Sequence, residues 1–508
     1  RAAGFLALGL ARGAAGTPQE LVAVVTTSGT AVANLHPAVL EAHHAGVPLV
    51  VLSADRPHEL RGSGASQTAD AQARMFLPSV RYSADLPAPL DPQRQAPAWR
   101  SVVSRAVAAA RGLRGEGPGP VHLDVGFADP LTPSADDLPA DPVGLTRVAP
   151  APAAQPVVLA RGPRTLVLAG DAPDPVTGAA ARELAERAGW PLLAEPSSGA
   201  RAGECAVGPY RLLLDAVDPQ GRLGDVERVV LYGHPTLSRP VTRLLGRDDV
   251  DLVVVAAAGN WPDAGFRAAT VLPAATVDAP AGEREQEFSA RWMRAAKLAA
   301  DAVDGVLDAE GAVSGPWAGR QTVAACAADG SAFVVAASNP VRDVDVAARP
   351  AEVRTISNRG LAGIDGTLAT ASGVAYVCGP TRVLVGDLAF LHDANALLPV
   401  VGDVRPDLTV VLVNDDGGGI FETLEHAAAV DRATFERVVA TPHGVDMAAL
   451  CAAYGVAHLR PTTVAEAVAA IGERPAGLRV VELVVERAAV KPRVDRIADA
   501  VRAAVVDA

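Results

Sequence analysis

The chain has 508 residues and a formal net charge of −13, with 49% hydrophobic, 20% charged and only 4% aromatic residues. This composition can fill large cores, so it excludes a disordered, collagen-like or disulfide-stapled chain, and the length predicts two to four domains. The 45 basic residues are 43 arginines and the lysines Lys297 and Lys491. The acidic excess disfavours nucleic acid and anionic membrane as partners.

The four cysteines lie far apart and form no C-x-x-C motif, so the sequence predicts neither a zinc site nor a disulfide framework. A reducing cytoplasm fits this pattern best. No apolar run approaches the roughly 18 residues that span a bilayer, which argues against a membrane protein. The chain begins at Arg1 and enters a helix-like segment, Ala2–Ala11, directly, so we expect that an N-terminal piece precedes it.

Over the first 130 residues, apolar runs of strand length alternate with helical stretches rich in small residues. The runs and stretches are Leu21–Val25, Val32–Ala45, Pro48–Ser53, Trp99–Leu113 and Val121–Val125. Such alternation is typical of a parallel, doubly wound α/β sheet. The stretch Leu131–Pro156 is rich in Pro, Ala and Asp and is interpreted as an interdomain linker.

The same alternation continues through two further units. In the second we expect strands at Thr165–Ala169, Pro191–Ala194, Arg228–Tyr232 and Leu252–Ala256, and helices at Pro175–Ala188 and Glu283–Leu307. In the third we expect strands at Phe333–Ala336, Val383–Val385, Thr409–Val413 and Val480–Val485. The prediction is an α/β protein with three parallel-sheet domains, over residues 1–145, 150–310 and 318–508.

Acidic residues follow two neighbouring strands of the third unit. Asp387 ends the run Val383–Asp387, and Asp415 follows the run Leu408–Asn414 after one crossover. In a right-handed βαβ unit both strand ends lie at one edge of the sheet, so the two carboxylates are expected to meet. A hard divalent ion such as Mg²⁺ relieves their repulsion and leaves room for phosphate oxygens.

Three glycines, at positions 417–419, follow these acids and expose backbone amides that can approach an anion. Taken alone, Asp415-Asp416-Gly417 is better explained as a strand-ending turn than as a binding site. The second acidic strand end favours a metal–diphosphate site instead. Motifs of other phosphate-binding and catalytic sites are missing: the sequence contains no P-loop, no nucleophile elbow and no H-E-x-x-H motif. The nearest candidate for a G-x-G-x-x-G dinucleotide motif, Gly62–Gln67, ends in Gln where the motif requires Gly.

Gly386-Asp387 followed by Asn414-Asp415 resembles the thiamine-diphosphate motif of the decarboxylase superfamily, with Leu388 where most members have a third glycine. Further motifs are similar to those of the MenD family, the 2-succinyl-5-enolpyruvyl-6-hydroxy-3-cyclohexene-1-carboxylate synthases. They are Thr27–Asn34, Ser53–Pro57, Gly64–Gln67, Gly119–His122, Ser338–Arg342, Ser357–Gly360 and Gly363–Gly366. The resemblance runs from Arg1 to about Val485 and is weakest in the middle unit.

The resemblance implies a cofactor, a metal and an assembly. The first domain would grip the pyrimidine of thiamine diphosphate, the third its diphosphate, and the site would form between these domains of two subunits in a homodimer or homotetramer. Asp387, Asp415 and the carbonyl of Gly417 would bind Mg²⁺ or Mn²⁺. The cofactor-binding set would be Gly363, Ile364, Gly386, Asp387, Leu388, Asp415, Gly417, Gly418, Ile420 and Phe421.

The implied reaction decarboxylates 2-oxoglutarate and adds the resulting four-carbon unit in 1,4 fashion to isochorismate, in menaquinone biosynthesis. Both substrates carry two carboxylates, and arginine offers each a permanently charged planar fork. By matched position, the third domain would supply Ser338, Arg342 and Arg359, the first Arg56 and Gln67, and the middle domain Arg239. The resemblance assigns catalytic roles to Gln67 and Arg342. Ser66 stands where the family has Asn.

In the family, an activating glutamate belongs to an Asp-Glu-Arg-Ala-Ala-Gly run, whereas this chain begins Arg1-Ala2-Ala3-Gly4. We therefore expect the glutamate to precede Arg1 in a longer parent protein. The chain by itself is then expected to bind cofactor weakly, to turn over slowly and to lack a strand of its first sheet. His443 fits a family motif, but its residue type assigns it no role.

Three alternatives remain open from the sequence. One is another thiamine-diphosphate carboligase or decarboxylase, against which the arginine set and Leu388 argue. The second is a non-catalytic relic that keeps a diphosphate site without its glutamate. The third is a nicotinamide dehydrogenase, which the missing dinucleotide fingerprint disfavours.

Overall fold

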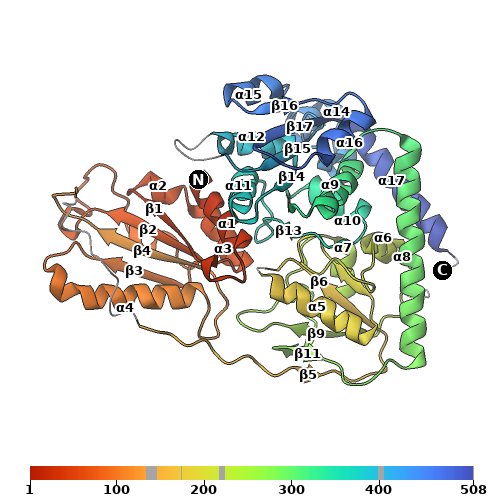
Figure 1. Ribbon diagram of the computed structural model, residues 1–508, viewed down its shortest axis with the longest axis horizontal. Helices are drawn as coiled ribbons and strands as arrows, with labels where there is room; N and C mark the ends of the chain where they lie inside the picture. Colours follow the sequence, from red (N-terminus) through yellow and green to blue (C-terminus); the bar gives the residue numbers. More distant parts are fainter. Residues whose placement is uncertain (133–145, 173, 217–222, 399–404, 507–508) are drawn as a thin grey trace.

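The computed structural model describes residues 1–132, 146–172, 174–216, 223–398 and 405–506, which form three α/β units (Figure 1). In Figure 1 the first unit lies at the left, the middle unit below and the third unit above. Every strand pair recorded in the three main sheets is parallel. The predicted fold class is therefore confirmed. Most of the expected linker, at 133–145, lies outside the described residues.

The sheet of the first unit has the order β1-β2-β4-β3. Its elements are α1 (Ala2–Gly13), β1 (Val22–Thr26), α2 (Thr30–Ala33), α3 (His36–Ala45), β2 (Leu49–Asp55), β3 (Tyr82–Leu86), α4 (Pro92–Ala110) and β4 (Pro120–Gly126). The expected helix over 32–45 is interrupted before Pro37, which occupies the first turn of α3. The edge strand β3 was not predicted, because its half-exposed residues lack a buried apolar run.

The middle sheet has the order β10-β9-β8-β6-β7, beside a small ladder of β5 and β11. Its elements are β5 (Val157–Val158), β6 (Thr165–Ala169), α5 (Pro175–Ala188), β7 (Leu192–Ala194), α6 (Tyr210–Ala216), β8 (Arg228–Tyr232), α7 (Arg239–Leu245), β9 (Asp251–Val255), β10 (Ala268–Leu272), β11 (Ala275–Thr276) and α8 (Glu283–Glu310). Strands β6 and β8 and helix α5 have the predicted bounds. The continuous burial of β6 and β8 explains why their apolar runs are so clear.

The third sheet has the order β13-β12-β14-β15-β17-β16. Its elements are α9 (Gly315–Asp329), β12 (Ala332–Val335), α10 (Asn339–Ala347), β13 (Thr355–Ile356), α11 (Thr367–Cys378), β14 (Thr381–Gly386), α12 (Asp387–His392), β15 (Leu408–Asn414), α13 (His426–Ala429), α14 (Arg432–Thr434), α15 (Met447–Ala453), β16 (Ala457–Leu459), α16 (Val464–Gly472), β17 (Leu478–Val484) and α17 (Val490–Val505). The central strands β14 and β15 pair directly, with Gly386 opposite Val413. Their carboxyl ends therefore lie side by side.

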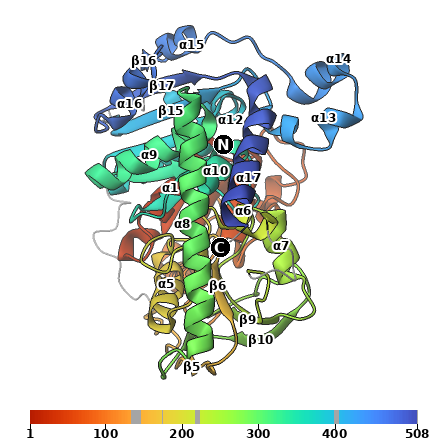
Figure 2. The ribbon, with the colours of Figure 1, turned by 90° about the vertical axis from the view of Figure 1, so that its right-hand side faces the viewer.

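Two long helices connect the middle and third units at one side of the molecule (Figure 2). Helix α17 runs beside α8, and Val501 and Ile497 join the middle unit's core around Trp292. At their upper contact Arg493 donates to both oxygens of Glu310, with distances of 2.8 to 3.1 Å. The helix that ends the described chain is thus packed against the middle unit as well as its own.

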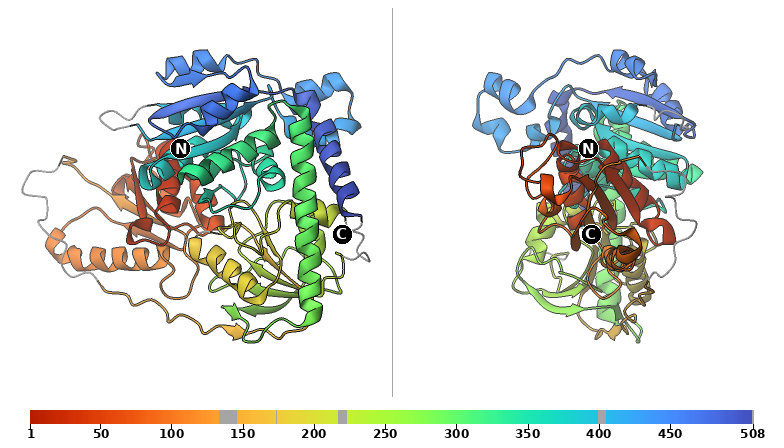
Figure 3. Two further views of the ribbon diagram at one scale, coloured as in Figure 1. Left: turned by 45° about the vertical axis from the view of Figure 1, so that its right-hand side comes forward. Right: turned by 90° about the vertical axis from the view of Figure 1, so that its left-hand side faces the viewer.

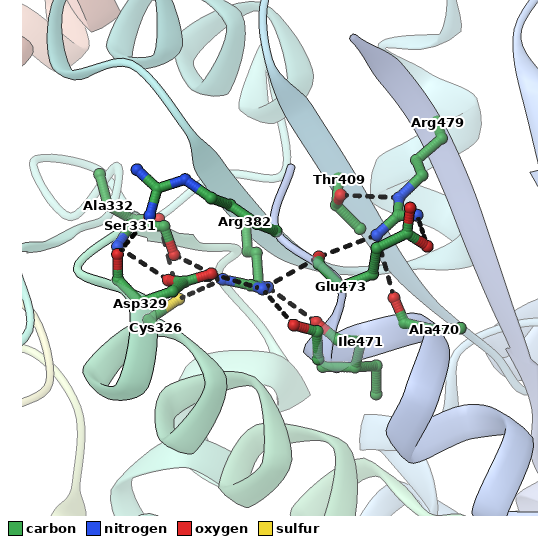
Figure 4. Close-up of polar contacts among 12 residues, drawn as sticks. Cys326, Asp329, Ser331, Ala332, Arg382, Thr409, Ala470, Ile471, Glu473 and Arg479 are labelled. Carbon is green, nitrogen blue, oxygen red and sulfur yellow. Dashed lines mark hydrogen bonds and ion pairs between the residues drawn. The ribbon is translucent and has the colours of Figure 1, made fainter. Parts of the chain in front are cut away.

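Arg382 lies near the start of β14, at the end of the sheet opposite to the strand ends that carry Asp387 and Asp415. Figure 4 shows its polar contacts. Its side chain is fully buried, yet each of its five N–H groups has an acceptor. The acceptors are the carbonyls of Ile471 (2.8 Å), Gly472 (3.2 Å) and Glu473 (3.1 Å), the Ser331 hydroxyl (2.5 Å) and the Asp329 carboxylate (3.1 Å). Although burial raises the pKa of Asp329, hydrogen bonds from Arg382 and Ser331 lower it to about 2.

Replacing Arg382 is expected to destabilise the third unit. Arg382→Met keeps an apolar side chain of similar length but leaves Asp329 and several buried carbonyls without their donor, which costs about 3–5 kcal/mol. Urea unfolding followed by circular dichroism measures the loss. Arg502→Met is the matched control, since Arg502 is exposed and pairs with Asp499 in the same helix. Equal unfolding midpoints for the two variants would contradict the assignment.

Candidate active site

A cavity of about 180 Å³ opens at the carboxyl ends of β12, β14 and β15. Residues from the glycine turn after β15, the start of α10 and the face of α17 form its walls. They include Gly315, Ser338, Asn339, Asp343, Ile364, Gly386, Asp387, Leu388, Asp415, Gly417, Gly418, Gly419, Ile420, Phe421, Val490, Arg493 and Val494. Nine of the ten residues expected around the cofactor line this one cavity; Gly363, which precedes Ile364, is not among its described walls.

Asp387 lies where β14 ends and α12 begins, and only 2% of its surface is exposed. One carboxylate oxygen, Oδ2, accepts the backbone N–H groups of Asp415 (3.2 Å) and Gly417 (2.9 Å). The other, Oδ1, accepts the N–H of Leu388 (2.6 Å). The strand end and the glycine turn are thus joined through one carboxylate, and the structure brings positions 387 and 415 together.

The pKa of Asp415 is affected by the nearby carboxylate of Asp387. Burial, and after it the negative charge of Asp387, raises the pKa of Asp415 to about 7. Its Oδ1 atom is buried and has no hydrogen-bond partner among the described residues. A buried oxygen without a partner is unfavourable unless a donor or a cation reaches it. The pair therefore fits a divalent ion held mainly by oxygen atoms.

The described residues contain no cluster of three or more His, Cys, Asp or Glu side chains able to hold a metal. A metal at Asp387 and Asp415 therefore needs further oxygen ligands from backbone, water or a bound phosphate. The backbone of the turn is shaped for close approach: Gly417 has φ of 139°, and a Cβ there would lie 2.3 Å from the carbonyl oxygen of Ala440. Only glycine fits this position.

His443 reaches the same carboxylate from a distant loop. Its Nε2 lies 3.3 Å from Asp387 Oδ2, while its Nδ1 accepts the backbone N–H of Val445 at 3.0 Å. With Nδ1 accepting, the neutral ring carries its proton on Nε2, facing Asp387. The sequence alone assigned His443 no role; the structure puts it against the carboxylate of the acidic pair.

None of the arginines expected to bind substrate is among the described walls of this cavity. Arg342 donates to the Ser338 carbonyl at 2.7 Å, and burial, then the charges of Arg211 and Arg359, lowers its pKa. Ser338 does line the cavity, and it caps α10 with φ of 73°, a conformation costly for a non-glycine residue.

Arg359 and Arg239 differ strongly in their surroundings. Arg359 is 3% exposed and donates to the Thr236 hydroxyl (2.9 Å) and carbonyl (3.0 Å) in the middle unit. Arg239 is exposed and pairs with Glu425 at 2.7 Å. The middle unit therefore contacts Arg359 through Thr236, which lies three residues before Arg239 in the chain.

Arg56 and Gln67 of the first unit are not among the described walls of the cavity. Gln67, with φ of 61°, approaches the Thr27 hydroxyl at 3.5 Å, and Arg56 donates to the Ser66 carbonyl at 3.1 Å. The strands of their sheet and helix α17 lie on opposite sides of α1 and α11 (Figures 1 and 3). Neither residue therefore borders the cavity that contains the acidic pair of the same chain.

Sequence reasoning missed two charged walls of the cavity, Asp343 and Arg493. Burial raises the pKa of Asp343 to about 7, while Arg211 and Arg493 act in the opposite direction. Asp343 directly follows Arg342, so its position after a substrate-binding motif was a usable signal. No sequence signal pointed to Arg493, because the packing of α17 on α8 is what brings this residue to the cavity.

Comparison with known proteins agrees with this geometry. Residues 1–75 match the model of the thiamine pyrophosphate enzyme N-terminal TPP binding domain, and residues 345–482 match that of the C-terminal TPP binding domain. Benzoylformate decarboxylase from Polynucleobacter necessarius shares the fold, with a TM-score of 0.59 and 16% identity over 95% of this chain and 90% of that one. Fold and matched domains define a thiamine-diphosphate-dependent enzyme.

Closer relatives specify the family. A 2-succinyl-5-enolpyruvyl-6-hydroxy-3-cyclohexene-1-carboxylate synthase of Kineococcus radiotolerans is 80% identical over 505 residues, which cover 99% of this chain and 90% of the relative. The synthase of a Nocardioides species is 45% identical over 507 residues, covering 96% and 86%. The chain belongs to the family of 2-succinyl-5-enolpyruvyl-6-hydroxy-3-cyclohexene-1-carboxylate synthases. The resemblance expected from the motifs is confirmed, and the dehydrogenase alternative is rejected.

The described residues contain no helix long and apolar enough to cross a membrane.

Proposed function

We propose that this enzyme decarboxylates 2-oxoglutarate and adds the resulting four-carbon unit in 1,4 fashion to isochorismate, with release of CO₂, in cytoplasmic menaquinone biosynthesis. The observation that carries the proposal is the pair of carboxylates, Asp387 and Asp415, on the wall of a cavity in a chain 80% identical to a synthase of that name. The proposed domains are 1–145 for the pyrimidine, 150–310 in the middle and 318–508 for the diphosphate.

Asp387, Asp415 and the Gly417 carbonyl would hold Mg²⁺ or Mn²⁺. The unpartnered Oδ1 of Asp415 and the raised pKa of its carboxyl support this role, since a cation at that place lowers the repulsion between the two acids. The exposed amides of the turn that contains Gly418 would face the diphosphate. Among the described residues no third His, Cys, Asp or Glu side chain joins these two acids. Oxygen atoms of the diphosphate would therefore complete the coordination shell of the metal, so the site needs metal and diphosphate together.

Thiamine diphosphate, when bound, supplies an electron sink for the carbanion left by decarboxylation. The chain's own apolar residues, Ile364, Leu388, Ile420 and Phe421, would support the cofactor and exclude water from the cavity that they line. Gly386 would keep its part of the cavity wall free of a side chain. Excluding water protects the carbanion equivalent from protonation until the second substrate arrives.

The substrates are dianions, so their recognition needs fixed positive charge. Arg342 and Arg359 with Ser338 would hold the carboxylates of 2-oxoglutarate, and Arg56 and Gln67 those of isochorismate. Gln67 and Arg342 would contact the reacting groups directly. Arg239 would have to leave Glu425 before it reaches a substrate, which is inexpensive because both side chains are exposed.

The proposed site is shared between subunits of a homodimer or homotetramer. Arg56 and Gln67 are outside the cavity that Asp387 and Ser338 line in the same chain. A second copy related by a two-fold axis would present its first domain to that cavity and receive the same in return.

The metal assignment predicts a calorimetric difference between two substitutions. Asp415→Ala removes the ligand oxygens and is expected to weaken Mg²⁺-dependent binding of thiamine diphosphate by at least about tenfold. Asp415→Asn keeps one oxygen and relieves the repulsion by Asp387, so its affinity should stay closer to that of the wild type. Asp495→Ala, an exposed residue on α17, is the control. No heat from the wild type with cofactor and Mg²⁺ would refute the site.

The reaction assignment predicts that 2-oxoglutarate consumption and CO₂ release depend on isochorismate. The protein is expressed with any residues that its gene encodes before Arg1. Arg342→Ala is expected to raise the KM for 2-oxoglutarate by at least about tenfold through loss of a charged hydrogen bond. Arg349→Ala, beyond the end of α10 and paired with Asp301 and Asp304, should not. Turnover of 2-oxo acids without isochorismate would instead indicate another carboligase or decarboxylase.

The shared site predicts complementation between two inactive variants. Co-expressed Gln67→Ala and Asp387→Ala chains form mixed dimers in which one of the two sites has both residues intact, so about a quarter of the wild-type activity is expected for random pairing. Each variant alone should be nearly inactive. Mixed protein no more active than the separate variants would show that each chain uses only its own residues.

A further inference from the structure

Arg359 is a buried cation with an unusual set of partners. Its residue is 3% exposed, and Thr236 supplies the acceptors for Nε and Nη2. In the described part of the chain no carboxylate oxygen lies within 4.0 Å of its guanidinium, and its Nη1 has no hydrogen-bond partner there. A buried guanidinium without a direct ion pair is costly, and here only the charge of Glu195, on the far side of Thr236, offsets it in part. The free Nη1 leaves room for a carboxylate from outside the protein.

Glu195 fixes the position of Thr236, which in turn accepts the hydrogen bonds of Arg359. It follows β7 and is 2% exposed, and burial raises its pKa to about 7. Its Oε1 accepts the backbone N–H groups of Thr236 (2.8 Å) and Leu237 (2.9 Å), and its Oε2 lies 3.4 Å from the Thr236 hydroxyl. The hydroxyl can therefore accept from Arg359 and donate to Glu195 at the same time. Glu195 and Thr236 of the middle unit and Arg359 of the third thus form one chain of hydrogen bonds.

A second buried glutamate fixes the backbone beside Arg359 from the first unit. The carboxylate oxygens of Glu41, on α3, accept the N–H groups of Gly360 and Leu361, both at 2.7 Å. A Cβ at Gly360 would lie 2.6 Å from the Glu41 carbonyl oxygen, so glycine permits this close approach. The loop that bears Arg359 is thus held on its backbone by Glu41 and on its side chain by Thr236.

We infer that Glu195 and Thr236 are positioning residues for substrate binding: they orient the Arg359 guanidinium toward a carboxylate of the 2-oxo acid, with Glu41 fixing the backbone of the same loop. Neither residue touches the reacting atoms. Both act through Arg359, so the inference rests on the proposed role of that arginine. It assigns the middle unit a part in recognising the dicarboxylate, through a buried hydrogen-bond chain in addition to the exposed Arg239.

The test is a double-mutant cycle on the active enzyme. Thr236→Val keeps the side chain's shape and removes the hydroxyl, and should raise the KM for 2-oxoglutarate by about tenfold while kcat changes by less than about twofold. Glu195→Gln should shift the same KM in the same direction. In an Arg359→Lys background, Thr236→Val should add less than about a twofold further change, because the partner of the hydroxyl is already altered.

The controls separate positioning from general damage. The KM for isochorismate and the affinity for thiamine diphosphate of Thr236→Val should match those of the wild type. Glu183→Gln, an exposed substitution on α5 of the same unit, should change none of these values. If the Thr236 and Arg359 effects multiply independently, or if the KM for 2-oxoglutarate is unchanged in Thr236→Val, the inference is overturned. A wild-type enzyme that does not use 2-oxoglutarate would instead refute the proposed function.

Discussion

The repulsion between two carboxylates at neighbouring strand ends is the constraint on which the site depends. Gly386 pairs with Val413 in a parallel register, so the residues that follow, Asp387 and Asp415, cannot move apart without breaking the sheet. Asp387 is satisfied by three backbone N–H groups, whereas Asp415 is left with a buried, unpartnered oxygen and a raised pKa. The polypeptide therefore creates an unfavourable charge, which the divalent ion proposed for this site would neutralise.

Buried charges also hold the three units together around this site. Arg12 of α1 pairs with Asp171 of the middle unit at 3.3 Å, and both side chains are nearly inaccessible. Glu41 and Glu195 reach the loop at Arg359 from two different units. Such groups contribute little net stability when they are compared with apolar residues, but each tolerates only one arrangement of its partners. We interpret them as setting the orientation of the units, and through it the position of the Arg359 side chain.

Much of the fold could be predicted because its central strands are continuous apolar runs. Strands β6 and β8 and helix α5 have the expected bounds, and the two acidic strand ends were found from the same runs. The edge strand β3 was missed because a half-exposed strand needs no apolar run. Gly363 was expected in the cofactor-binding set through its place in a motif, and only Ile364 beside it is among the described walls of the cavity. A motif places its residues in one neighbourhood without showing which of them borders the cavity.

The sequence by itself determined the α/β class, the acidic pair and its glycine turn, and the family, because these depend on residues close together in the chain or on one crossover. Only the tertiary structure decided that Arg493 closes the cavity from α17, that Thr236 and Glu195 hold Arg359, and that Arg56 and Gln67 lie away from the acidic pair. Those relations join segments that are distant in the chain: Glu195 and Thr236 are 41 residues apart, and Thr236 and Arg359 are 123 apart. They follow from how three separately formed sheets pack against one another, which no local pattern encodes.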